Sequence, residues 1–321
     1  MRSGASHMHA LIVIFPVRRP ANIAARFGYD SIMSHTNSSS RRDVLKIAAV
    51  VVAGASVPLG FATAPRAQGA EATPSDPWRG LKMGMASYSF NQLPLDACVK
   101  AIQRLDLHYV SIKDSHLKLN TSTEERKAVA QKFRDAGITP LSCGVVNFKN
   151  EEKSARNAFE YARDIGVPTI VSAPDPEALD LCEKLVKEFD IRFAIHNHGP
   201  TDKHFRTPTD TFNAIKDRDP RMGLCIDVGH TARVGADPVE DIHRYKDRLF
   251  DMHMKDVTNK TPQGKATECG RGVLDIPGMF RSLLEIKYSH HVGLEYEKDL
   301  KDPIPGASES IGYMKGVLRM M

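Results

Sequence analysis

Short apolar segments alternate with longer amphipathic segments along residues 81–321, and this alternation predicts strands separated by helices. The apolar segments begin near residues 83, 109, 140, 168, 192, 223, 249 and 292. Between them, stretches such as 122–137 and 154–166 carry apolar residues at helical spacing and end in glycine. Eight strands alternating with helices over about 240 residues predict an α/β fold, the (β/α)8 TIM barrel.

A doubly wound open sheet is the alternative arrangement of the same elements. No glycine-rich phosphate loop follows the first apolar segment, which counts against a dinucleotide-binding sheet. A long polar stretch, residues 257–272, follows the seventh segment. Loops that follow barrel strands carry function, so this stretch is expected at the functional end of a barrel.

Alternate positions along a strand face opposite sides, so each segment predicts which side chains point into the barrel. In the seventh segment, Phe250 and Met252 alternate with Asp251 and His253. The apolar parity is expected to pack beneath the helices, and the other parity is expected to fill the interior.

The interior parity places five chemically active side chains near the carboxyl ends of five strands. These are Lys113, His196, Asp227, His253 and Glu295. A single histidine or aspartate at a strand end is more often a helix cap or a satisfied hydrogen-bonding residue. Four such residues on matched parity in successive strands instead predict a catalytic mouth, where charged groups need a partner.

A divalent cation would satisfy these four groups together. His196, Asp227, His253 and Glu295 supply two imidazoles and two carboxylates. That set suits Mn²⁺, Zn²⁺, Co²⁺ or Fe²⁺ better than Mg²⁺. We therefore predict one bound divalent metal ion.

The first 70 residues differ in character from the remainder. Arg41 and Arg42 precede an apolar run, residues 47–64, which ends in small residues. This order predicts an N-terminal extension and twin-arginine signal peptide over residues 1–70, and a single barrel domain over residues 71–321. A buried helix and an uncleaved membrane tether are the alternatives. We expect a periplasmic or exported protein with no stable membrane insertion after signal cleavage.

The positive charge of the chain belongs to that N-terminal segment. Of 44 basic and 39 acidic residues, eight and two lie within residues 1–70, which leaves 36 and 37 in the rest. A nearly neutral barrel argues against nucleic acid as a partner. The five cysteines form no C-x-x-C pair, which argues against a zinc ribbon or a disulfide scaffold.

Several strand ends also resemble a known family, the xylose isomerase-like TIM barrels, also called the sugar phosphate isomerase/epimerase family. The resemblance spans most of residues 81–318 and lies in AIHNHG, GLCIDVGH, DMHMKD, GRGVLD and GLEYE. It implies Asp227, His253 and Glu295 as metal ligands, and His230 as a substrate contact.

The fifth strand departs from the family pattern. Relatives often read I-E-N-H, whereas this chain has His196 in place of the glutamate, followed by Asn197 and His198. Family members often use two glutamates as paired bases, and a metal-bound imidazole is a poor base. A symmetric shuttle between Glu295 and a second glutamate is therefore doubtful here.

Other groups at the mouth are candidates for proton transfer and substrate binding. The general base is expected among His198, Lys113, Lys255 and Glu297, and His116, His230 and Glu297 are expected to contact substrate. A lysine close to a cation would have a lowered pKa. Each of these residues also has an alternative, structural role. Lys113 could pair with Asp114 or a barrel carboxylate, Lys255 with Asp256, and Glu297 could stabilise Lys298 or a loop. His116 could simply lie at the surface. His204, His243, His290 and His291 fit no such pattern and are expected to be solvated.

The residues and the resemblance together predict a metal-dependent enzyme that acts on a small carbohydrate by proton abstraction beside a carbonyl. An isomerase or epimerase of a sugar or keto-sugar is the first expectation, and a β-eliminating lyase or hydratase on a keto-glycoside is the alternative. A metal-dependent endonuclease and a non-catalytic sugar-binding barrel are weaker alternatives. The sequence is also compatible with assembly into a homo-oligomer.

Overall fold

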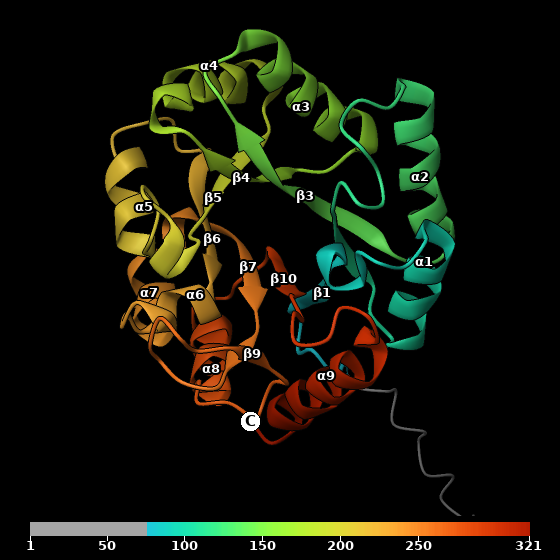
Figure 1. Cartoon of the computed structure of the whole chain (residues 1–321), viewed down its shortest axis with the longest axis vertical. Helices are drawn as coiled ribbons and strands as arrows, with labels where there is room; N and C mark the ends of the chain where they lie inside the picture. The colour runs from blue at the N-terminus through green and yellow to red at the C-terminus, as the bar shows by residue number, and fades with distance from the viewer. Residues whose placement is uncertain (1–75) are drawn as a thin grey trace, which may run out of the picture. The chain divides into compact units, whose positions relative to one another are not determined.

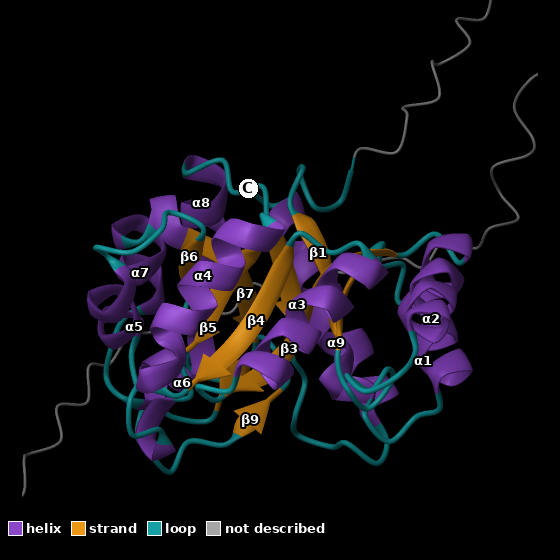
Figure 2. Ribbon diagram, turned by 90° about the horizontal axis from the view of Figure 1, so that it is seen from above, coloured by secondary structure: helices purple, strands orange, loops and turns teal. Residues whose placement is uncertain are grey.

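The computed structural model describes residues 76–321, and these residues form a closed barrel of eight parallel strands. Figure 1 shows the helices as a ring around the strands, and Figure 2 shows the strands enclosed between them. The predicted (β/α)8 TIM barrel is confirmed, and the open-sheet alternative is excluded. The predicted signal peptide lies outside the described residues.

Each barrel strand begins within a few residues of an apolar segment. The barrel strands are β1 (Lys82–Ala86), β2 (Tyr109–Ile112), β3 (Thr139–Phe148), β4 (Thr169–Pro174), β5 (Arg192–His196), β6 (Met222–Asp227), β7 (Leu249–Met254) and β10 (His291–Leu294). They follow the order β1-β10-β7-β6-β5-β4-β3-β2. The polar stretch after β7 contains a small antiparallel pair, β8 (Asp256–Val257) and β9 (Ala266–Thr267).

Helices connect the strands and cover the outside of the barrel. They are α1 (Leu95–Arg104), α2 (Thr123–Asp135), α3 (Glu152–Ile165), α4 (Leu179–Phe189), α5 (Pro208–Ile215), α6 (Val228–Arg233), α7 (Pro238–Arg244), α8 (Ile276–Glu285) and α9 (Pro303–Arg319). The Ser122 hydroxyl caps α2 by accepting a hydrogen bond from Glu125 N–H. Gly166 ends α3 in the left-handed conformation that glycine adopts at little cost.

The outward-facing strand residues form the main hydrophobic core beneath the helices. On β5, the Phe193 ring lies parallel to the Phe159 ring of α3, with centroids 6.1 Å apart. Phe148 at the end of β3 packs edge-on against Phe193, with centroids 5.0 Å apart. Such aromatic contacts add to the burial of apolar surface that holds each helix against the barrel.

The predicted parity is correct on most strands and wrong for Phe250. Pairing between β6 and β7 slips by one residue, because Leu224 pairs with Leu249 and Cys225 pairs with Asp251. The slip leaves Phe250 without a partner on β6, and its side chain packs inside the barrel against Ala194 and Cys225. A local irregularity of this kind turns a side chain to the other face of a sheet.

Candidate metal centre

The strand register brings the four predicted ligands to one end of the barrel. Asp227 on β6 pairs with His253 on β7, which in turn pairs with Gly293 on β10. Glu295 follows β10 and donates its backbone N–H to the Met254 carbonyl at 2.8 Å, which continues the same register. His196 ends the neighbouring strand β5.

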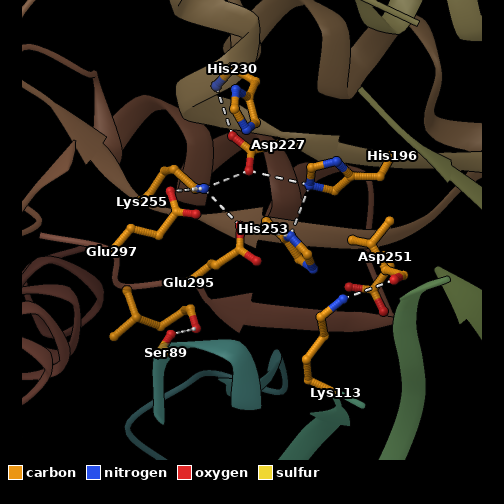
Figure 3. A network of polar contacts seen from close by, with 12 residues as sticks. Ser89, Lys113, His196, Asp227, His230, Asp251, His253, Lys255, Glu295 and Glu297 are labelled. Carbon is orange, nitrogen blue, oxygen red and sulfur yellow. Dashed lines mark hydrogen bonds and ion pairs between the residues drawn. The ribbon is translucent and has the colours of Figure 1, made fainter. Parts of the chain in front are cut away.

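Ligand atoms of His196, Asp227, His253 and Glu295 all lie within 4.8 Å of one another. His196 Nε2 lies 3.0 Å from His253 Nδ1 and 3.4 Å from Asp227 Oδ2. His253 Nδ1 lies 3.1 Å from Glu295 Oε2. Figure 3 shows these groups converging on a common point. All four residues are buried, so water cannot satisfy them fully.

Asp227 is fixed by contacts with the residues that follow it. Its Oδ1 accepts a hydrogen bond from His230 N–H at 2.8 Å, so the carboxylate caps α6. The Asn197 side chain accepts from Asp227 N–H at 3.0 Å and donates to the Thr231 hydroxyl at 3.1 Å. Asn197, turned away from the two flanking histidines, therefore orients a candidate ligand.

Lys255 lies among three carboxylates. Its Nζ is 2.8 Å from Asp227 Oδ2, 2.7 Å from Glu295 Oε2 and 2.8 Å from Glu297 Oε2. Burial alone would lower the pKa of Lys255, but these carboxylates raise it well above its usual value. Without a cation Lys255 is thus the counter-ion of three carboxylates, and the lowered pKa expected of a lysine beside a bound cation stays a prediction.

The expected alternative partner of Lys255, Asp256, has another role. Its carboxylate accepts backbone N–H groups of Val257, Gly270, Gly272 and Leu274 at 2.9 to 3.1 Å. Asp256 thus holds the segment 257–274 against the end of the barrel, next to the candidate centre.

A cavity of about 230 Å³ opens above the cluster. Its walls carry Tyr88, Lys113, Val145, His196, His198, His230, Glu295 and Glu297. Six of these eight residues are predicted site residues. Tyr88, in the short helix η2 (Ser87–Phe90), is an addition that no sequence signal distinguished from an ordinary aromatic residue.

Two candidate acid/base groups, His198 and Lys113, and the expected substrate contact His230 differ in their surroundings. Burial lowers the pKa of His198, and its Nδ1 lies 3.5 Å from Asp202 Oδ2. Burial also lowers the pKa of His230, to about 4. Lys113 donates to the Val145 carbonyl at 3.0 Å and lies 3.6 Å from Asp114. Both histidines are therefore neutral near pH 7.

His116 lies outside this cavity and is buried rather than exposed. Its Nδ1 is 3.1 Å from the Ser87 hydroxyl, and its Nε2 is 3.1 Å from the Phe90 carbonyl. Both ring nitrogens are thus engaged with η2, and the structure gives His116 no place at the cavity wall.

His291, expected to be solvated, is buried inside the barrel. Its Nδ1 lies 3.3 Å from Asp251 Oδ1, one residue layer below the cluster. Asp251 could have been identified from the interior parity that also identified His253. His291 lies four residues before Glu295 and so has the same parity. That parity predicts an interior position for His291, contrary to the expected solvation.

The cluster fits a divalent cation. Two carboxylates and two imidazole nitrogens converge from four strands within bonding reach of a single point. Cations of the first transition series accept this mixture of nitrogen and oxygen ligands. The contacts of Asp227 with His230 and Asn197 supply the outer hydrogen bonds that orient ligands in metal sites.

A family model described as "Xylose isomerase-like TIM barrel" matches residues 99–317. This match covers more than half of the chain and most of the barrel. The chain belongs to the xylose isomerase-like TIM barrel family. The resemblance seen in the strand-end motifs is thereby confirmed, and this barrel is of the sugar isomerase/epimerase type.

Individual relatives of the family have different activities. An inosose dehydratase of Geobacillus kaustophilus is 27% identical over 138 residues, which cover 38% of this chain and 44% of the relative. The chain thus spans about half the length of the curated relatives it matches.

Solved structures show the same fold at lower identity. The 3-keto-D-glucoside 4-epimerase of E. coli is 15% identical, with a TM-score of 0.61 over 74% of this chain and 99% of that chain. An IolI protein with a bound zinc atom is 15% identical, with a TM-score of 0.63 over 75% and 100%. Among residues 76–321, no helix combines the length and the apolarity needed to cross a bilayer.

Proposed function

We propose that this protein is a divalent-metal-dependent enzyme that removes a proton from the carbon beside a carbonyl group of a sugar or keto-sugar, as an isomerase or epimerase does. The observation that carries the proposal is the convergence of four ligand-type side chains under a cavity that also presents His198, Lys113 and Glu297. A divalent cation at the cluster would supply Lewis acidity to a substrate carbonyl.

The general base is most simply His198 or Lys113. His198 is neutral near pH 7, and its Nδ1 lies 3.5 Å from the Asp202 carboxylate. Lys113 approaches from β2, a strand that is not adjacent to β5 in the barrel. Two such groups on separate strands could remove a proton from one side of a carbon and return it on the other, without the paired glutamates.

The substrate is proposed to be a small polyhydroxylated carbohydrate. Most side chains that line the cavity are polar, and they offer donors and acceptors to hydroxyl groups. The names of two relatives, an inosose dehydratase and a 3-keto-D-glucoside 4-epimerase, both denote keto-carbohydrate substrates.

Dehydration by β-elimination is the second candidate. His196 replaces the glutamate of the family pattern, and elimination needs one base and one acid rather than a matched pair of bases. The similarity to inosose dehydratases also favours this outcome. Both candidates begin with the same proton abstraction.

One experiment separates the candidates and tests the shared step. The metal-loaded protein is incubated in D₂O with a panel of keto-sugars, 3-keto-glucosides and inososes, and the products are followed by NMR. Deuterium at the carbon beside the carbonyl supports the shared step; an epimer or isomer then identifies the first candidate, and an unsaturated ketone identifies the second. Absence of exchange with every substrate would refute proton abstraction.

We also propose that the protein is exported by the twin-arginine route and works in the periplasm. The supporting observation is the pair Arg41 and Arg42 ahead of an apolar run. A folded reporter fused to residues 1–75 should be exported, and replacing both arginines by lysine should keep it in the cytoplasm. Unchanged export of the lysine variant would contradict this route.

A further inference from the structure

A second cavity, of about 170 Å³, lies at the opposite end of the barrel, where the strands begin. Its lining includes Lys82 at the start of β1, Arg192 at the start of β5 and Thr169 at the start of β4. Ser289, His290 and His291 complete the polar wall from the segment that leads into β10. The metal cluster lies at the other ends of these strands, so the two sites are separate.

The two basic side chains of this cavity lack an acidic partner among the described residues. Within residues 76–321, neither Lys82 nor Arg192 forms an ion pair. The Arg192 guanidinium instead lies over the Phe250 ring, 5.6 Å from its centroid. Stacking on an aromatic face limits the motion of the guanidinium and leaves its N–H groups free for an acceptor.

The inner wall of the cavity is built around the buried His291. Its ring occupies space that two glycines leave open, because a Cβ on Gly84 would lie 2.6 Å from His291 Nε2 and one on Gly293 would lie 2.7 Å from Cε1. His291 Nε2 is buried and has no hydrogen-bond partner among the described residues. Since Nδ1 faces the Asp251 carboxylate, Nε2 of the neutral ring is an acceptor, and a protonated oxygen of HPO₄²⁻ or H₂PO₄⁻ in the cavity would satisfy it.

One carboxylate also faces this region. Asp251 Oδ1 lies 3.3 Å from His291 Nδ1, whereas Asp251 Oδ2 is buried with no hydrogen-bond partner among the described residues. Against it stand Lys82 and Arg192, with the Thr169 and Ser289 hydroxyls as further neutral donors. The balance of charge and donors around the cavity is therefore that of an anion receptor.

We propose that this cavity binds a phosphate-sized oxyanion. Arg192 would contact two of its oxygens, Lys82 would supply a second positive charge, and the hydroxyls would donate to the remaining oxygens. The volume of this cavity is suited to a small tetrahedral anion. It is too small to hold a carbohydrate as well as the anion. The site is independent of the proposed enzymatic reaction.

Calorimetric titration of the metal-loaded protein with inorganic phosphate, and separately with sulfate, tests the proposal. Arg192→Gln and Lys82→Gln should each weaken binding by about tenfold or more, since each removes one charge-assisted contact. Lys287→Gln is the matched control, because this exposed lysine lies in the same segment before β10 but outside the cavity. It should bind phosphate like the unmodified protein.

Three results would overturn the proposal. The unmodified protein could show no heat of binding at millimolar phosphate, or all three variants could weaken binding equally, which would indicate a general charge effect. Alternatively, Lys113→Gln could abolish binding while Arg192→Gln preserves it, which would place the anion at the mouth. Using both Lys82→Gln and Arg192→Gln keeps the test decisive if one of them fails to fold.

Discussion

His196 Nε2 lies 3.0 Å from His253 Nδ1, which is hydrogen-bonding distance for two ring nitrogens. Burial lowers the pKa of His196 to about 3, so its ring is neutral. Burial also acts to lower the pKa of His253, but Cys225 and Glu295 outweigh it and raise that pKa well above its usual value. Without metal His253 therefore carries a proton, and its Nδ1 faces both His196 Nε2 and Glu295 Oε2.

Metal binding should release this proton. His253 must be neutral to coordinate a cation, so its raised pKa opposes metal at low pH, and metal affinity should rise with pH through the neutral range. Calorimetric titration of the metal-stripped protein with Zn²⁺ or Mn²⁺, in two buffers of different ionisation enthalpy, measures the protons released. The same affinity at pH 6 and pH 8, with no proton release, would contradict the predicted exchange.

Removal of a ligand should abolish metal binding and activity together. His253→Ala and Asp227→Ala each delete one of four converging groups. Loss of an outer partner of a ligand typically costs about 10–100-fold in metal affinity, so loss of a ligand itself should cost at least as much. Elemental analysis of the purified variants measures the occupancy. His243→Ala is the control, because His243 is exposed and lies 3.4 Å from Glu285 on the outside of the barrel. Full occupancy in either ligand variant would refute the ligand set.

Lys255 should matter most when no metal is bound. Lys255→Met leaves three carboxylates facing one another, and losing one partner of a buried ion pair costs about 3–5 kcal/mol. A cation would take over part of this compensation, so metal should raise the melting temperature more in the variant than in the unmodified protein. Lys255→Arg, which keeps the charge, should behave like the unmodified protein. Equal metal-induced shifts in all three proteins would argue against the counter-ion role.

The two candidate bases can be distinguished by substitution. Loss of a general base typically lowers kcat by about 10²–10⁴-fold. Lys113→Met and His198→Asn should therefore differ in kcat while both keep the metal, because neither residue belongs to the ligand cluster. Deuterium exchange at the substrate carbon identifies which variant has lost proton abstraction. Unchanged kcat in both variants would indicate that another group, such as Glu297, is the general base.

Asp241 should destabilise the barrel at neutral pH. Burial raises the pKa of its carboxyl to about 6 from 3.8, so the folded state holds its proton more tightly than the unfolded state does. The contribution of this carboxyl to the free energy of unfolding is fully present below about pH 4. It is lost as the pH rises through 6, and the loss is at most about 3 kcal/mol.

Asp241→Asn should therefore raise stability at pH 7–8, with the advantage disappearing near pH 4. Urea unfolding at several pH values measures the difference. Asp237→Asn on the same helix provides the contrast, because the Asp237 side chain accepts the Val239 N–H and caps α7, so that substitution should not stabilise the protein. A pH-independent effect of Asp241→Asn would contradict the explanation by burial.

Local sequence patterns were enough to predict the barrel and most of the candidate centre. Apolar segments of regular spacing specify strands, and the two-residue period of a strand specifies which side chains face inward, so His196, Asp227, His253 and Glu295 could be placed together before any coordinates. The strand-end motifs could also be assigned to a family because they depend on local order and spacing.

The pairing of these side chains depends on the folded barrel and could not be predicted from local patterns. Lys255 became a counter-ion because three carboxylates from β6 and the end of β10 meet at its Nζ, which no local pattern could indicate. Phe250 turned inward because the register between β6 and β7 slips by one residue. His291 was buried because glycines on β1 and β10 leave space for its ring. Each outcome depends on contacts between strands that are distant in the sequence, and the period of a single strand carries no information about them.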